Sequence, residues 1–360
     1  MRKVHISYAK PGDRIAKTIF TESGNILLGT GIELSERFIE RLKNMGIDTI
    51  YVDDKHTDDI FPEDIIRDET RKRAVESVYK TMTTLMDSPT VKGRSSIPDL
   101  GKTFRSVFGD ILTDISSRKE VLVNLANLHT LDGYLFHHSV NVAVLAGIMG
   151  ISKGYNRDQL IDLGIGALLF DIGMTNLPKE LWNKKGPLTD EERKRINNHT
   201  EDGYQILRYE HDISLLSAHC ALQHHERFAG IGYPRELRNE EIHEYAQIVS
   251  IADVYDALIS PRSYRQGYNP NEATEFLMAA GNTHFNLDLV KIFLRHISVF
   301  PVSTTVQLNT GHVGIVSQVD PIAVHRPVIR ILQEPDGTPT AAPYELDLKK
   351  ELHLIITKTL

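Results

Sequence analysis

The sequence predicts a mainly α protein that has a small N-terminal α/β module and a short C-terminal β appendage. Between residues 99 and 296 apolar residues recur at helical spacing, for example at Ile251, Val254 and Leu258. After Pro301 the apolar period changes to two, which is typical of strands. We therefore expect an accessory module, a helical linker, a helical domain and a β-rich appendage at residues 1–60, 61–98, 99–299 and 300–360.

The N-terminal module is predicted from a hairpin, a helix and a strand. Glu22 and Gly24 lie in a stretch of turn-forming residues between two extended segments. Ser35 can cap the helix that follows, and Gly46 can end it. The hairpin, helix and strand are expected at residues 15–34, 36–45 and 49–52, with a connecting helix at residues 65–87.

The β appendage is predicted from alternating apolar and polar residues. The turn-forming residues Asn309, Thr310 and Gly311 separate its first two strands. The expected strands cover residues 304–308, 312–316, 328–332 and 352–357.

Composition excludes several classes of protein. There are 41 Lys and Arg residues against 48 Asp and Glu, a net charge of −7, which argues against broad contact with nucleic acid or anionic membrane. The longest apolar run, residues 142–151, is about half of what a membrane span requires, and the N-terminus has no apolar signal core. We therefore expect no membrane span and a cytoplasmic location. Cys220 is the only cysteine, so a metal site must use His, Asp and Glu.

A set of histidines and carboxylates in the helical domain forms a candidate metal site. Imidazole and carboxylate ligands suit divalent Fe, Mn, Zn or Ni, and a carboxylate can bridge two ions. The candidate ligands, each on or beside an expected helix, are His138, Asp171, His199, His224, His225 and Asp253.

The order of the motifs resembles the HD-GYP domain family from about residue 132 to residue 293. The most specific match is the pair His224 and His225, followed by Gly232, Tyr233 and Pro234. Other matching segments are residues 138–142, 170–173, 252–258, 261–265 and 280–285. The resemblance implies the all-helical fold of the HD superfamily. It also implies hydrolysis of cyclic di-GMP at two metal ions, with Fe or Mn preferred.

The resemblance implies one complete and one incomplete metal site. By position, one metal takes Asp171, His199, His224 and His225, and all four are present. The other takes His138, Asp171, Asp253 and the histidine of the family's His-Asp pair. This chain has Phe170 at that position, so it has Phe-Asp where the family has His-Asp. We expect one tightly bound metal, a second site that lacks one ligand, and reduced hydrolysis in which Asp171 and Asp253 are the catalytic carboxylates.

The resemblance also assigns residues and partners around the nucleotide. Arg262 and Arg265 can present forked donors to phosphate oxygens. Tyr233 and Asp256 are expected to contact substrate beside them. The implied partners are cyclic di-GMP or a related cyclic dinucleotide, and GGDEF-type signalling proteins that bind the Gly-Tyr-Pro loop. A homodimer is a further hypothesis.

Three hypotheses about function follow from the sequence. The leading one is a cyclic di-GMP phosphodiesterase homologue with an eroded metal site, either a slow hydrolase or a nucleotide-binding signalling protein. The alternative is a catalytically inactive interaction module that binds no nucleotide. The third is hydrolysis of a different phosphoester.

Overall fold

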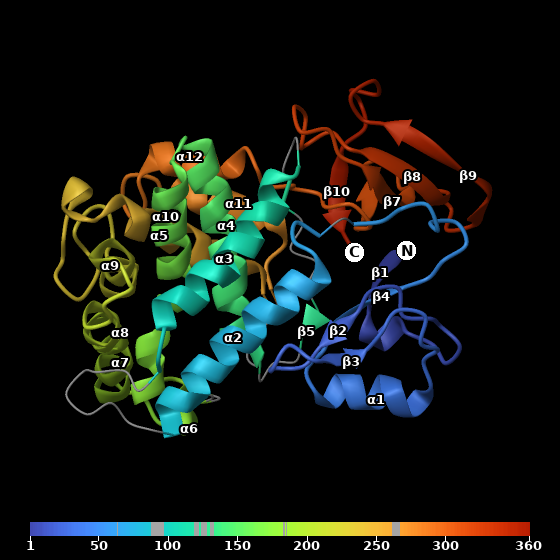
Figure 1. Ribbon diagram of the computed structural model, residues 1–360. Coiled ribbons are helices and arrows are strands. Elements are labelled where there is room, and N and C mark those ends of the chain that lie inside the picture. Colours follow the sequence, from blue (N-terminus) through green and yellow to red (C-terminus); the bar gives the residue numbers. More distant parts are fainter. Residues whose placement is uncertain are drawn as a thin grey trace.

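The computed structural model describes most of the chain (Figure 1), namely residues 1–62, 64–87, 97–118, 122–123, 128–129, 133–182, 184, 186–260 and 267–360. Helices dominate it, which confirms the predicted mainly α class. The α-helices that follow the N-terminal module are α2 (Asp68–Asp87), α3 (Leu100–Ser116), α4 (Tyr134–Ser152), α5 (Arg157–Leu169), α6 (Lys179–Trp182), α7 (Asp190–Asn197), α8 (His199–Arg208), α9 (Leu215–Gln223), α10 (Glu244–Ile259), α11 (Pro270–Ala279) and α12 (Leu287–Leu294). Short 3-10 turns lie at η1 (Ile6–Tyr8), η3 (Ile172–Asn176) and η4 (Asn239–Glu241).

Several helices begin at residues that satisfy the free N–H groups of the first turn. The side chain of Asn156 accepts from the backbone of Gln159, and the side chain of Gln159 returns a bond to the backbone of Asn156. Thr189 and Glu192 form the same reciprocal pair at the start of α7. Such capping boxes fix the residue at which a helix begins. For α5, this start also determines which residues lie at its C-terminal end, next to Phe170 and Asp171.

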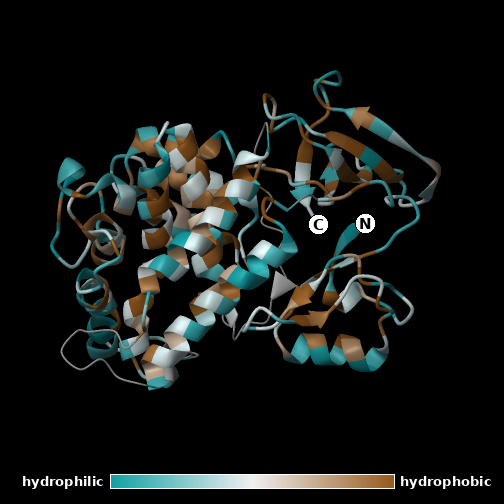
Figure 2. Cartoon of the chain, in the orientation of Figure 1, coloured by the Kyte–Doolittle hydropathy of each residue, from teal (hydrophilic) through white to brown (hydrophobic). Residues whose placement is uncertain are grey.

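Helix α4 lies at the centre of the helical domain. Every residue from Phe136 to Gly150 is buried, because α2, α3, α5, α10 and α12 pack around it. Figure 2 shows apolar residues concentrated in the middle of this domain and hydrophilic residues on outer helices such as α7. Among the described residues, α4 is the one helix long and apolar enough to cross a bilayer, but 83% of its apolar window is buried inside the protein. This burial is that of a core helix.

The N-terminal module has a core of its own. Strand β1 (Arg2–His5) pairs antiparallel with β4 (Thr49–Val52), and α1 (Glu36–Asn44) packs beside them. Ser35 caps α1 by accepting from Phe38 N, and Gly46 ends it at φ 74°, which confirms both predicted boundaries. The hairpin strands β2 (Ile19–Phe20) and β3 (Ile26–Leu28) are shorter than predicted. Strand β1 was not predicted, nor was β5 (Leu128–His129), which pairs parallel with β2.

The C-terminal appendage is a five-stranded antiparallel sheet in the order β10-β6-β7-β8-β9. Strands β6 (Thr305–Leu308), β7 (Val313–Gln318) and β8 (Val328–Gln333) confirm three predictions. The fourth prediction began too early, because residues 352–355 precede β10 (Ile356–Thr359). Strand β9 (Pro339–Asp347) was missed. It is a largely exposed edge strand, so its sequence has little of the alternation that reveals a half-buried strand.

Polar contacts connect the accessory parts to the helical domain and to each other. Lys17 of the N-terminal module pairs with Asp64 at 2.8 Å, in front of α2. The carbonyl of Thr21 accepts from Nε2 of His137, in the second turn of α4, at 2.9 Å. Arg330 of β8 pairs with Asp59, which joins the C-terminal sheet to the N-terminal segment. Figure 1 shows both parts on the same side of the helical domain. The domain boundaries stated above stay predictions.

Helices α3 and α5 pack closely enough to require glycine at position 164. A Cβ atom there would lie 2.2 Å from the ring of Phe108, whereas a Cβ at Gly109 of α3 would meet nothing within 4 Å. We predict that Gly164→Ala lowers the melting temperature, because overpacking of a core costs about 1–3 kcal/mol. Gly109→Ala is the matched control and should raise it slightly, since Ala gains about 0.5–1 kcal/mol over Gly within a helix. Thermal unfolding of both variants checks this, and equal melting temperatures would contradict it.

Candidate metal centre

Three helix ends meet at Asp171. Asp171 follows α5 and precedes the 3-10 turn η3, His199 is the first residue of α8, and His224 caps the end of α9. Gly173 permits this convergence. A Cβ atom at position 173 would lie 1.9 Å from the carbonyl oxygen of His199 and 2.5 Å from the amide nitrogen of Gly203. The turn that carries Asp171 can therefore rest against α8 only without a side chain at residue 173.

The ligand atoms of this group face one another. Oδ1 of Asp171 lies 3.3 Å from Nε2 of His199 and 3.6 Å from Nε2 of His224. The two Nε2 atoms are 3.3 Å apart. His225 belongs to the same cluster, since one ring nitrogen each of His199, His224 and His225 lie within 4.8 Å of one another. The structure thus brings together all four residues predicted for the complete site.

Backbone carbonyls orient two of the imidazoles. Nδ1 of His199 donates to the carbonyl of Ile196 at 2.6 Å, and Nδ1 of His224 lies 3.0 Å from the carbonyls of Cys220 and Ala221. Because a carbonyl only accepts, these contacts keep a proton on Nδ1, so Nε2 is the nitrogen that can release its own proton and bind a metal. Two such Nε2 atoms beside a carboxylate form a donor set that fits a divalent transition metal.

The same contacts perturb the acid–base properties of the group. Burial raises the pKa of Asp171, but hydrogen bonds to His199 and His224 outweigh burial and hold that pKa well below its usual range. Burial lowers the pKa of His199, and its bond to Asp171 reverses the effect and raises it. Burial and the neighbouring rings of His224 and His199 hold the pKa of His225 well below its usual range, so this imidazole is neutral.

His138 and Asp253 form a second group. Nε2 of His138, on α4, lies 3.0 Å from Oδ1 of Asp253, on α10. Nδ1 of His138 lies 2.7 Å from Oδ2 of Asp256, one turn further along α10. Burial lowers the pKa of His138, but the bonds to Asp253 and Asp256 outweigh burial and raise it to about 9. The ring of Tyr134 stacks on that of His138, with centroids 4.9 Å apart.

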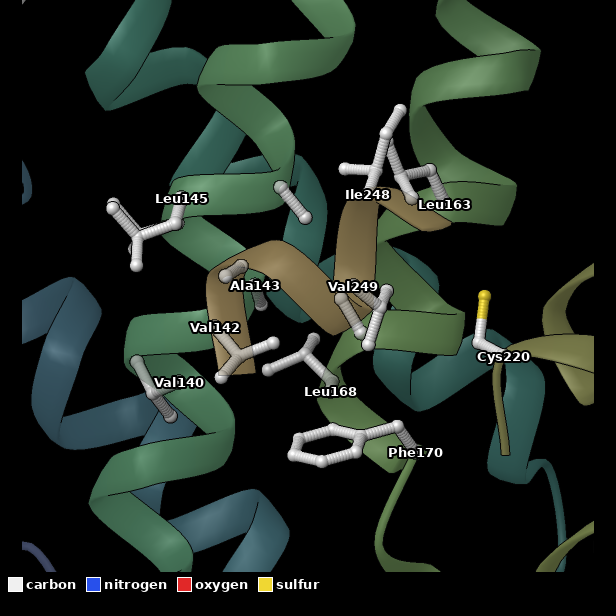
Figure 3. Packing of buried hydrophobic residues seen from close by; sticks show 14 of the residues in the cluster. Val140, Val142, Ala143, Leu145, Leu163, Leu168, Phe170, Cys220, Ile248 and Val249 are labelled. Atoms are coloured by element: carbon white, nitrogen blue, oxygen red, sulfur yellow. The ribbon is translucent and has the colours of Figure 1, made fainter. Parts of the chain in front are cut away.

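Phe170 lies between the two groups. Its side chain is fully buried, and its ring packs edge-on against His138 at 5.6 Å and against His224 at 4.9 Å between centroids. Figure 3 shows the ring among core side chains, pointing from the end of α5 toward the helix that carries Val140. A phenyl ring has no lone pair, so the position between the two groups offers no ligand.

The remaining predicted residues have different surroundings. Tyr233 is half-buried, and its ring lies 4.8 Å from that of His225. The structure differs from expectation at Asp256, because its carboxylate is 1% exposed and bonded to His138 and Asn141 rather than turned to a surface that a nucleotide reaches. The spacing of three residues from Asp253 was the missed signal, since both carboxylates then share a helix face. Arg262 and Arg265 lie outside the described residues.

The Gly-Tyr-Pro loop is held by a carboxylate that the sequence analysis did not assign. Glu226 is 2% exposed and accepts from the backbone N–H of Arg235 at 2.8 Å and of Leu237 at 3.0 Å. At Gly232 the loop packs against the backbone of Arg227. A Cβ atom at position 232 would lie 2.4 Å from the amide nitrogen of Arg227. Tyr233 is therefore positioned beside His225 by Glu226 and by a glycine that allows close approach.

Comparisons with known proteins agree with this architecture. A family model described as an HD domain matches residues 114–289, and one described as a KOW domain associated with HD domain matches residues 305–360. The chain is 34% identical over 211 residues to the cyclic di-GMP phosphodiesterase PA4108 of Pseudomonas aeruginosa, covering 58% of this chain and 51% of that protein. It is 31% identical over 197 residues to a cyclic di-GMP phosphodiesterase of Thermotoga maritima, covering 54% of this chain and 53% of that protein.

Two further similarities are weaker. The 3'3'-cGAMP-specific phosphodiesterase 2 of Vibrio cholerae is 29% identical over 201 residues, covering 55% of this chain and 38% of that protein. The solved structure of Bd1817, a HDG"Y"P protein from Bdellovibrio bacteriovorus, aligns with a TM-score of 0.48 and 18% identity, over 81% of this chain and 97% of that one. The chain spans about half the length of the first two curated relatives.

The contacts of Glu226 predict a local effect of its removal. Glu226→Ala should free the N–H groups of Arg235 and Leu237, and a hydrogen bond to a charged group is worth about 1.5–3 kcal/mol. We expect these two amides to exchange with deuterium roughly 10- to 150-fold faster, because local opening then costs less. Glu240→Ala, a change at an exposed position in η4, is the control. Unchanged exchange in Glu226→Ala would show that other contacts hold the loop.

Proposed function

Because this chain belongs to the HD domain family and is related to cyclic di-GMP phosphodiesterases, we propose that it is an HD-GYP-type homologue with one complete and one incomplete metal site. It takes cyclic di-GMP and hydrolyses it slowly or not at all, acting in the latter case as a nucleotide-binding signalling protein. The observation that carries the proposal is the position of the Phe170 ring between the groups of His224 and His138.

The complete site consists of Asp171, His199, His224 and His225. Its support is the convergence of Nε2 atoms on Oδ1 of Asp171, with the Nδ1 atoms of two imidazoles engaged by carbonyls. A divalent transition metal bound there supplies Lewis acidity toward the oxygens of a phosphodiester. The ionised carboxylate of Asp171 adds negative charge, and the neutral ring of His225 adds no positive charge. Both properties suit a site that is to hold a cation.

The incomplete site consists of His138, Asp171 and Asp253. In the metal-free state His138 and Asp253 form an ionic hydrogen bond, so they already lie close together. The fourth ligand is missing at Phe170. Loss of a residue that is hydrogen-bonded to a metal ligand lowers metal affinity or activity by roughly 10- to 100-fold. Loss of a ligand itself should lower them further.

The nucleotide contacts are a separate part of the proposal. Tyr233 lies beside His225, next to the complete site, and can contact a bound dinucleotide there. Arg262 and Arg265 stay predicted phosphate ligands. GGDEF-type proteins at the Gly-Tyr-Pro loop, a homodimer and a cytoplasmic location also stay predictions.

Metal content tests the assignment of the two sites. After dialysis against a mild chelator, we predict a metal content closer to one equivalent per chain than to two. The reason is that one site has four ligands and the other has three. His224→Ala or His225→Ala should abolish that metal, whereas His138→Ala should matter less. His211→Ala, at an exposed position, is the control. Elemental analysis checks this, and two full equivalents in the unaltered protein would contradict it.

Restoring the missing ligand tests the mechanism. We predict that the wild type with Mn or Fe hydrolyses cyclic di-GMP slowly or not at all, and that Phe170→His raises both metal content and rate by supplying a lone pair in a ring of similar size. Phe170→Leu, which has no lone pair, should raise neither. Chromatography of the products gives the rate. Rapid hydrolysis by the wild type would refute the incomplete site, and metal gain without hydrolysis would assign the defect to other residues of the cleft.

Calorimetric titration with cyclic di-GMP separates the proposal from the interaction-module hypothesis. The proposal requires that wild-type protein loaded with metal binds the nucleotide, whether or not it hydrolyses it. If saturating nucleotide changes neither the heat nor the melting temperature, the interaction module becomes the better account.

A further inference from the structure

Helix α2 inserts a charged side chain into the core of the helical domain. Arg71 lies outside the residues that match the HD domain model, which begin at residue 114. Yet its side chain is 2% exposed and ranks among the largest fully buried ones. Its Nη1 donates to Oδ1 of Asn141, on α4, at 2.9 Å. Burial of a guanidinium costs free energy of folding unless the charge is paired and hydrogen-bonded. Arg71 therefore requires a network of hydrogen-bonded partners.

That network leads to His138. Nδ2 of Asn141 donates to Oδ1 of Asp256 at 2.9 Å, and the other oxygen of Asp256 lies 2.7 Å from Nδ1 of His138. Nε2 of His138 then faces Asp253 at 3.0 Å. All of these residues are at most 8% exposed. A continuous buried chain of hydrogen bonds therefore runs from α2 through α4 and α10 to the incomplete metal site.

The direction of each bond in this chain is fixed by the chemistry of Arg71. A guanidinium has donors and no acceptor, so Asn141 must turn its carbonyl oxygen toward Arg71 and its NH2 group toward Asp256. Asp256 then receives a donor on each oxygen, one from Asn141 and one from His138. A carboxylate that accepts from Nδ1 of an imidazole fixes the ring and leaves Nε2 for a metal.

We propose that Arg71 is a positioning residue for the metal site of His138 and Asp253. Through Asn141 it holds the carboxylate of Asp256 against Nδ1 of His138, so that Nε2 is turned toward Asp253. This inference rests on the proposed function, because it assigns a metal to that pair. It extends the working unit of the domain to α2, beyond the residues shared with the family model.

The N-terminal module touches the same helix. Lys17 pairs with Asp64 at 2.8 Å, and the charges of Asp64 and Asp68 both act on Arg71. A change in the module that moves Lys17, and with it Asp64, therefore alters the electric field at Arg71, at the far end of the hydrogen-bond chain from the metal ligands.

The first arm of the test needs no metal. In metal-free wild-type protein, the proton of His138 that is shared with Asp256 should give a downfield imidazole signal in 15N-edited NMR. Arg71→Met, which keeps an unbranched apolar stem but removes the guanidinium, should shift or broaden this signal. Arg73→Met is the matched control, because Arg73 lies on the same helix but is exposed and pairs with Asp110. A His138 signal that is unchanged in Arg71→Met overturns the inference.

The second arm measures metal affinity in Phe170→His protein, where the site has all its ligands. Titration with Mn or Co ions should show two equivalents. Adding Arg71→Met should weaken the second by about 10- to 100-fold and leave the first unchanged. Arg71→Lys should restore part of the loss, since it keeps the charge without the fork. Equal weakening of both equivalents would mean general structural damage and would overturn the inference.

A second variant covers the case in which Arg71→Met does not fold. Asn141→Asp keeps the partner of Arg71 and the size of the side chain but removes the donor to Asp256, and it should reproduce both effects. The two arms also separate the inference from the proposed function. If Phe170→His takes up no second metal while the His138 signal depends on Arg71, the metal assignment fails and the positioning role stands.

Discussion

The close approach of the turn η3 to the first turn of α8 is the constraint on which the metal centre depends. Asp171 precedes this turn and His199 begins α8, so the distance between the two backbones sets the distance between their ligand atoms. The absence of a side chain at Gly173 allows contact with the carbonyl of His199. Binding and catalytic groups must be held within about 0.5 Å of their working geometry, and a methyl group at residue 173 would displace them by more.

Phenylalanine at position 170 fits this framework without disturbing it. The ring packs edge-on between two imidazoles, an arrangement that aromatic pairs favour. Packing and ligation are therefore separable at this residue, since the ring shape serves the first and a lone pair the second. The fold is retained because His138 still has Asp253 and Asp256 as partners in the absence of a ligand at residue 170.

Helical spacing in the sequence predicted the helical domain, and the resemblance to the HD-GYP family predicted the cluster around Asp171. It could not reveal Gly173 or Arg71 as constraints, since each acts on a residue that is distant in the sequence but near in space. Strand β9 was missed because an exposed edge strand needs no apolar face. The resemblance assigned Asp256 to substrate, and only the packing of α10 against α4 shows that it is buried behind His138.

The separation of His138 from Asp256 along the chain bears on how the protein is made. The two residues are 118 positions apart, and chains are synthesised at about 5–20 residues per second, so roughly 6–24 s pass before Asp256 can reach His138. During this interval α4, which is buried on all sides in the finished fold, has only part of its final surroundings. Helices α2 and α3 are made before α4 and can cover one flank, with Arg71 already beside Asn141. On the ribosome, the same arginine is thus available to shield the polar face of α4 until α10 arrives.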